Sequence, residues 1–270
     1  LMKTSFFFIL YFMPFLVLGQ GVEQENKVGS FYLYWGWNGS QYLTSNLHFS
    51  GEHYDFILSD VQAKDRQTPF DFSTYFSPTT FTIPQYNYRL GYYLKNNYDI
   101  SIGMDHMKYV MVANQKVSIS GEIAQSNTPY DGNYSSDEIS LSPDFLQFEH
   151  TDGLNYVNVE LRKTKLLTEY KSFKMSEMHG LGLGLIVPKT NTTLLGHERF
   201  DEFHLSGYGA SIVTGLRFDY KKVFIQAELK GGWINMPHIR TTSNTIDVAK
   251  QSFFFSQFNV VFGVFFLDLK

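Results

Sequence analysis

The amino-acid sequence predicts an all-β fold, an antiparallel up-and-down transmembrane β-barrel of about 10 strands, with about 8 as the alternative. Three observations predict this fold. Long strand-like segments alternate with turn clusters, and most segments have one apolar and one polar face. An export signal precedes them, and no later stretch has the roughly 18 consecutive apolar residues that indicate a transmembrane helix.

The strand-like segments are long enough to cross a bilayer. A tilted transmembrane strand needs about 9–11 residues, whereas a typical soluble strand has about 5–6. The expected strands are 28–38, 51–63, 84–95, 98–112, 115–124, 152–168, 176–188, 203–219, 222–236 and 252–268. With all of them in the wall, 64–83 becomes a long periplasmic connection, against the usual asymmetry of such barrels. Placing 28–38 or 115–124 outside the wall removes this conflict.

Alternation assigns one face of each strand to lipid and the other to the lumen. In 222–236, for example, Val223, Ile225 and Leu229 oppose polar residues. The polar side chains expected in the lumen are Asn87, Arg89, Asp105, Glu160, Arg162, Gln226, Glu228 and Lys230. Because a barrel of this size is narrow, we expect these charges of both signs to pair and fill it.

The N-terminal residues predict export. Lys3 is followed by a short apolar run, 6–18, and then by the small residue Gly19. This pattern is typical of a cleaved signal peptide at 1–19, which leaves 20–270 as a single barrel domain. The expected location is the outer membrane of a Gram-negative bacterium.

Composition excludes several classes of chemistry. The chain has no Cys, so disulfides, cysteine-based metal sites and lipoprotein acylation are excluded. The net charge is −4 and no basic cluster is present, which argues against a nucleic-acid partner. The His residues lack metal-ligand spacing and no phosphate-binding glycine loop occurs, so we expect neither a metal nor a cofactor. Segment 125–151 is interpreted as a solvated acidic loop.

Four segments carry a resemblance to a known family. They are 34–38 (YWGWN), 84–87 (PQYN) with Arg89 and Gly91, 105–110 (DHMKYV) and 237–242 (PHIRTT). In these segments the chain resembles an uncharacterised outer-membrane β-barrel family of Bacteroidota. The resemblance extends over nearly all of the chain after the signal, and it implies a fold and a location rather than an activity.

Two small groups of residues are candidates for chemistry. Glu202, His204 and Ser206 would share one face of an extended strand, as an acid, a base and a hydroxyl do in hydrolases. The pair His204–Ser206 resembles the His-x-Ser pair of outer-membrane lipid A deacylases, although the Asn that follows the Ser in that family is Gly207 here. Side chains two residues apart on a regular strand are roughly 6–7 Å apart, so direct contact would need a bulge. His106 and Lys108 are expected to contact lipid headgroups where their strand leaves the membrane.

These observations favour a barrel without enzymatic activity, either a structural or accessory subunit of an envelope complex or a surface-loop binder. One alternative is a lipid A deacylase-like hydrolase that uses His204 and Ser206, and a second is a narrow pore. The expected partners are outer-membrane lipid and lipopolysaccharide, together with other envelope proteins.

Overall fold

The structure is a computed structural model that describes residues 28–77, 79–80, 82–197 and 203–268. The expected signal peptide at 1–19 and the candidate acid Glu202 lie outside the described residues. Among the helices of the described part, none combines the length and the apolar composition needed to cross a membrane.

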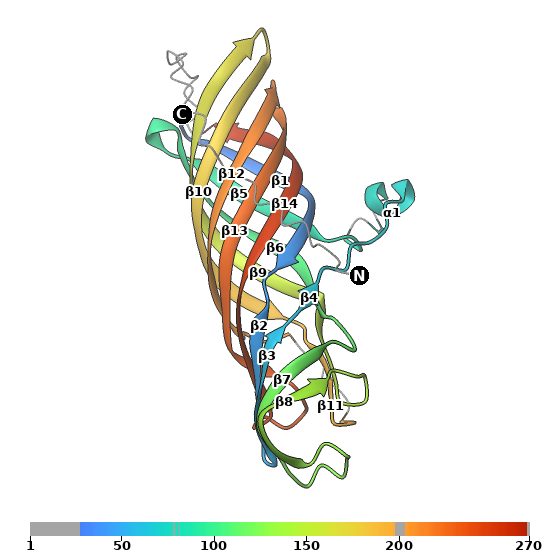
Figure 1. Cartoon of the computed structure of the whole chain (residues 1–270). Coiled ribbons are helices and arrows are strands. Elements are labelled where there is room, and N and C mark those ends of the chain that lie inside the picture. Colours follow the sequence, from blue (N-terminus) through green and yellow to red (C-terminus); the bar gives the residue numbers. More distant parts are fainter. Residues whose placement is uncertain (1–27, 78, 81, 198–202, 269–270) are drawn as a thin grey trace, which may run out of the picture.

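The wall is a closed ring of antiparallel strands, as the sequence predicts. Each wall strand pairs with the next wall strand along the chain, and the first, β1, also pairs with the last, β14, which closes the ring (Figure 1). Its members are β1 (Ser30–Tyr42), β5 (Tyr86–Tyr93), β6 (Tyr98–Met111), β9 (Leu146–Tyr170), β10 (Phe173–Pro188), β12 (Gly207–Tyr220), β13 (Val223–Arg240) and β14 (Val248–Asp268).

Eight strands therefore form the described wall. Eight is the alternative strand number that the sequence predicts, whereas about ten is the preferred number. The expected strands 51–63 and 115–124 fall on β3 (Tyr54–Val61) and β7 (Lys116–Ile123), which pair with each other outside the ring. The expected strand 28–38 belongs to the wall as β1. Periodicity could not separate these cases, because a strand outside the barrel alternates as regularly as one within it.

The two ends of the barrel differ in the length of their connections. At the short-turn end, two-residue turns connect β9 to β10 and β12 to β13. Lys171 in the first turn and Lys221 in the second have positive φ. The 3-10 turn η1 (Lys95–Asn97) joins β5 to β6 at the same end. The long connections all leave the opposite, outer end. Segment 64–83 is among them, so an eight-stranded ring removes the conflict in asymmetry that ten strands created.

The outer end carries a folded cap. Beyond β14, the sheet continues through β2 (Ser45–Ser50), β3, β7 and β8 (Gly132–Ser140). Two short strands complete it: β4 (Ala63–Lys64) pairs with β6, and β11 (Asn191–Leu194) pairs with β9. We call these strands, with the outer ends of β6, β9, β13 and β14, the outer cap. The acidic segment 125–151 is largely exposed, as expected, but it is not a loop throughout, because it contains β8 and the start of β9.

The interior changes character along the barrel axis. In the wall, the buried inward side chains are largely polar or charged, whereas the outer cap encloses an apolar core that includes Phe49, Phe56, Phe145 and Phe148. Outward side chains of the wall are apolar and exposed; Leu183 on β10 is 71% exposed. The wall is thus polar inside and apolar outside.

Candidate functional site

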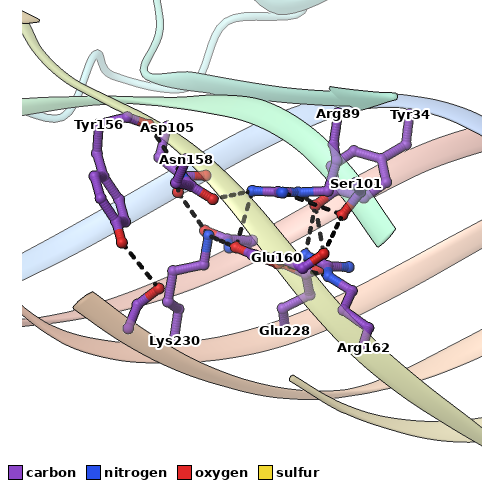
Figure 2. Close-up of polar contacts among 12 residues, drawn as sticks. Tyr34, Arg89, Ser101, Asp105, Tyr156, Asn158, Glu160, Arg162, Glu228 and Lys230 are labelled. Atoms are coloured by element: carbon purple, nitrogen blue, oxygen red, sulfur yellow. Dashed lines mark hydrogen bonds and ion pairs between the residues drawn. The ribbon is translucent and has the colours of Figure 1, made fainter. Parts of the chain in front are cut away.

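A network of buried charges crosses the lumen between opposite walls. Arg89 comes from β5, Glu160 and Arg162 come from β9, and Glu228 and Lys230 come from β13 (Figure 2). All of these side chains point inward because they occupy alternate positions on their strands. Each is at most 3% exposed.

Glu160 lies at the centre of the network. Its carboxylate is 2.8 Å from Arg89 Nη2, 2.6 Å from Arg162 Nε and 2.8 Å from Lys230 Nζ. Arg162 also reaches Glu228 at 2.8 Å, and Lys230 reaches Asp105 at 2.6 Å. Three cations therefore face three carboxylates, and each charge has an opposite partner.

Neutral groups satisfy the remaining lone pairs and protons. The Tyr34 hydroxyl accepts from Arg162 at 2.9 Å and from Arg89 at 3.1 Å. Asn158 donates to Asp105 at 3.1 Å, and Asn259 donates to Glu228 at 3.0 Å. Gln226 also donates to Glu228. Such bonds matter because a buried ion pair offsets its desolvation only when its other polar atoms are satisfied.

The structure thus brings together seven of the eight side chains that the sequence assigns to the lumen. The eighth, Asn87, is also buried, but within the described residues its amide has no hydrogen-bond partner.

A second buried cluster lies nearer the short-turn end and was missed from the sequence. Arg217 Nε lies 3.0 Å from an Asp219 oxygen, and the Arg217 guanidinium donates to the Tyr93 hydroxyl. The Tyr32 hydroxyl donates to Asp99 at 2.6 Å. The alternation of Arg217 and Asp219 with Leu216 and Phe218 was the signal that could have found them.

The space between the two clusters is nearly filled. A cavity of about 10 Å³ lies there, lined by Asp99, Arg162 and Arg217 among others. This volume is about the minimum that holds one water molecule. The lumen is therefore obstructed at this level, and the apolar core of the outer cap covers its outer end.

His204 and Ser206 meet directly at the outer end of the wall, just before β12. Ser206 Oγ lies 2.8 Å from His204 Nε2, and this contact forms because β12 begins only at Gly207, so the two residues are not on a regular strand. However, His204 Nε2 also accepts the backbone N–H of Arg240 at 3.0 Å, and Ser206 is 2% exposed.

His150 is a further buried histidine, near His204, that the sequence did not single out. Burial, together with a smaller repulsion from His204, lowers the pKa of His150 to about 3. Its Nδ1 lies 3.0 Å from Thr190 Oγ1. His150 is therefore neutral at physiological pH.

His106 and Lys108 lie on the outward side of β6. The His106 ring stacks on Tyr86 with 4.8 Å between centroids, and its Nδ1 lies 2.8 Å from Asn155 Oδ1. Lys108 Nζ donates to the backbone oxygen of Ile83 at 3.0 Å. Lys108 thus ties the 65–85 connection to the wall.

Among the residues that the structure describes, no group of three or more acidic or His side chains could hold a metal ion. No protein-family model matches the chain, and no curated protein matches it.

Several solved structures are similar in fold. The outer membrane protein AlkL is 9% identical with a TM-score of 0.41, and the match covers 93% of this chain and 97% of AlkL. OprG from Pseudomonas aeruginosa is 11% identical with a TM-score of 0.36, covering 89% and 97%. Neisserial surface protein A is 11% identical with a TM-score of 0.35, covering 87% and 96%.

Proposed function

We propose that this chain is an outer-membrane β-barrel of a Gram-negative bacterium that does not conduct and that displays its outer cap as a binding surface. In this role it acts as a surface binder or as an accessory subunit of an envelope complex. The observation that carries the proposal is the lumen, which is filled by a charge-balanced network and covered by an apolar core.

The distribution of polarity supports a membrane location. Leu181, Leu183 and Ile212 are all more than 60% exposed, and they stand on the outward face of the ring, where none of the described residues covers them. In water, such a continuous apolar exterior would be unfavourable, whereas in lipid it is the stable arrangement for a closed barrel. The polar atoms of the strands are paired around the ring, as a bilayer requires.

Export and orientation belong to the same proposal. The residues 1–19 have the pattern of a cleaved signal, and the family resemblance implies a Bacteroidota origin. Short turns face the periplasm in barrels of this kind, so the short-turn end would lie there and the outer cap at the cell surface. His106 and Lys108 would then lie near outer headgroups, including those of lipopolysaccharide.

The outer cap has a feature suited to binding other envelope proteins. Within the described residues, β8 pairs with β7 alone, so it forms the edge of the cap sheet. Asp137 and Glu138 on β8 are exposed. An open strand edge can accept a further strand from a partner.

A pair of photoreactive residues tests this function in cells. One replaces Glu138 on the cap, and the matched control replaces Leu183 on the wall. We expect the photoreactive residue in place of Glu138 to crosslink to a protein and give an adduct of defined mass. The one in place of Leu183 should crosslink to lipid. The absence of a defined protein adduct at Glu138, with lipid adducts still formed at Leu183, would show that the cap binds no protein partner.

Conductance tests the narrow-pore alternative. We expect the purified protein to produce no stable current steps in a planar bilayer, because the ion pairs around Glu160 leave no continuous aqueous path. Regular steps would overturn the filled-lumen interpretation.

A lipid hydrolase is the second candidate, favoured by the 2.8 Å contact between His204 and Ser206. The burial of Ser206 and the second hydrogen bond to His204 Nε2 both oppose it, because substrate must reach the hydroxyl and the base must be able to take its proton. Loss of lipid deacylation in Ser206→Ala would support this candidate.

A further inference from the structure

The connection between β4 and β5 exposes several large apolar side chains among its polar ones. Its short helix α1 (Phe72–Phe76) and the adjoining residues leave Phe70 73%, Phe72 70% and Ile83 51% exposed. From residue 67 to 88 the sequence carries a single charged residue, Asp71. Few connections in water expose so many large apolar side chains together with so little charge.

The same connection lies beside the wall, and not beyond its outer end (Figure 1). The Trp37 ring, on the outward face of β1, is 5.0 Å from the ring of Phe76 and 5.5 Å from that of Tyr75. On its other side Trp37 contacts Phe262 of β14 at 5.8 Å. Helix α1 therefore packs on the apolar exterior of the barrel.

The position of Trp37 gives the depth of α1. Trp37 pairs with Val260, and the apolar outward face of β14 continues beyond this point through Phe258 to Phe254, both more than half exposed. Six residues of a strand tilted by about 40° advance about 15 Å along the barrel axis. The contact with α1 is thus well within the apolar band.

Several backbone groups of the segment have hydrogen-bond partners within it, which lowers the cost of placing them in lipid. Asp71 caps α1 by accepting from the Thr74 N–H at 2.9 Å. The Thr80 hydroxyl donates to the backbone oxygens of Ser73 and Thr74 at 3.0 and 3.1 Å, and the Tyr75 hydroxyl donates to that of Thr68 at 2.7 Å.

Both ends of the segment are fixed to the rim of the wall. Asp65 accepts from the Ser40 N–H at 2.7 Å and from Gln85 Nε2 at 2.8 Å, which joins the start and the end of the connection to β1. Arg66 pairs with Glu149 at 2.6 Å. The connection is therefore tied to the wall at both ends, and the ring contacts with Trp37 hold α1 against β1.

We propose that segment 67–77, with Ile83, is a membrane anchor whose exposed rings enter the acyl chains of the bilayer beside β1. The inference rests on the proposed membrane location. It adds a lipid-binding surface outside the barrel wall, which binds lipid through its buried apolar area as amphipathic membrane anchors do. The anchor would fix the depth and the rotation of the barrel, and so the presentation of the outer cap.

Single-cysteine labelling tests this anchor, since the chain has no Cys of its own. A polarity-sensitive fluorophore is attached to F72C, with L183C as the wall control and D137C as the cap control. Each protein is reconstituted into phosphatidylcholine vesicles. In one set the lipid carries a nitroxide quencher, and in the other set iodide is added to the buffer as a water-soluble quencher.

We expect the nitroxide lipid to lower the emission of F72C as much as that of L183C, and iodide to quench only D137C. Quenching of F72C by iodide, with L183C still quenched by nitroxide, would overturn the anchor and leave the membrane barrel standing. Shielding of F72C from both quenchers would also overturn it, in favour of a second copy covering the rings. Failure of nitroxide to quench L183C would instead overturn the membrane location itself.

Discussion

Neutralising Glu160 gives the sharpest test of the buried network. The Glu160→Gln substitution keeps the shape of the side chain but leaves Arg89, Arg162 and Lys230 facing only two carboxylates. All three cations lie within 2.8 Å of the Glu160 oxygens, and the site is shielded from water. Leaving a buried charge without its partner costs about 3–5 kcal/mol, so we expect the free energy of unfolding to fall by this amount.

A compensating change should recover part of the loss. Adding Lys230→Met to Glu160→Gln restores equal numbers of cations and carboxylates. Residues in one network typically couple by about 0.5–3 kcal/mol, so the double variant should be more stable than the sum of the single effects predicts.

The matched control is Glu177→Gln on the outward face. Glu177 lies 3.5 Å from Lys165, and both side chains are more than a quarter exposed. An ion pair of this kind contributes less than about 1 kcal/mol. The control uses the same substitution as Glu160→Gln, so only burial and partners differ.

Urea unfolding in lipid vesicles, followed by tryptophan fluorescence, measures these effects. The three Trp residues are all in the wall, at positions 35, 37 and 233. If Glu160→Gln lowers the free energy of unfolding no more than Glu177→Gln does, then the lumen is hydrated, and both the buried network and the closed barrel are refuted.

Three further predictions follow from the packing. An added Cβ at Gly91 would lie 2.1 Å from the Tyr32 ring, whereas at Gly231 its nearest neighbour is 4.0 Å away, so Gly91→Ala should destabilise by about 1–3 kcal/mol in urea unfolding and Gly231→Ala should not; equal effects would contradict this packing. The pKa of His150, about 3, lies below the value of about 6.5 in an unfolded chain, so the unfolded state takes up the proton first. The free energy of unfolding should then fall by up to about 1.4 kcal/mol per unit as the pH drops below about 6.5, and His150→Asn should reduce this slope; an unchanged slope would show that His150 is accessible to water. Ser206→Ala should leave lipid A acylation in the host unchanged, as mass spectrometry of extracted lipid would show, and an altered acylation pattern would favour the hydrolase.

Local periodicity made the two faces of the wall predictable. Alternate side chains of a strand point in opposite directions whatever the strand pairs with, so Arg89, Glu160 and Lys230 could be assigned to one face from sequence alone. The polarity of that face and the length of the strands then indicated a barrel. The sequence placed His204 and Ser206 within the expected strand 203–219, and the rise per residue showed only that direct contact would need a departure from a regular strand; the structure supplies that departure, because β12 begins at Gly207.

The sequence could not decide which distant strands contact each other. The number of wall strands depends on whether β14 pairs with β1 or with β2, and β14 pairs with both, at different levels. The contact between Lys230 and Asp105 joins residues 125 positions apart.

By itself, then, the sequence determined which side chains face inward and that the fold is a membrane-type barrel, because strand alternation is a property of the backbone. Only the tertiary structure decided the eight-stranded closure, the folded cap and the position of α1 on the wall. Each of these depends on hydrogen bonds and ring contacts between segments far apart in the chain, and the alternation within one strand does not specify which distant strand it pairs with.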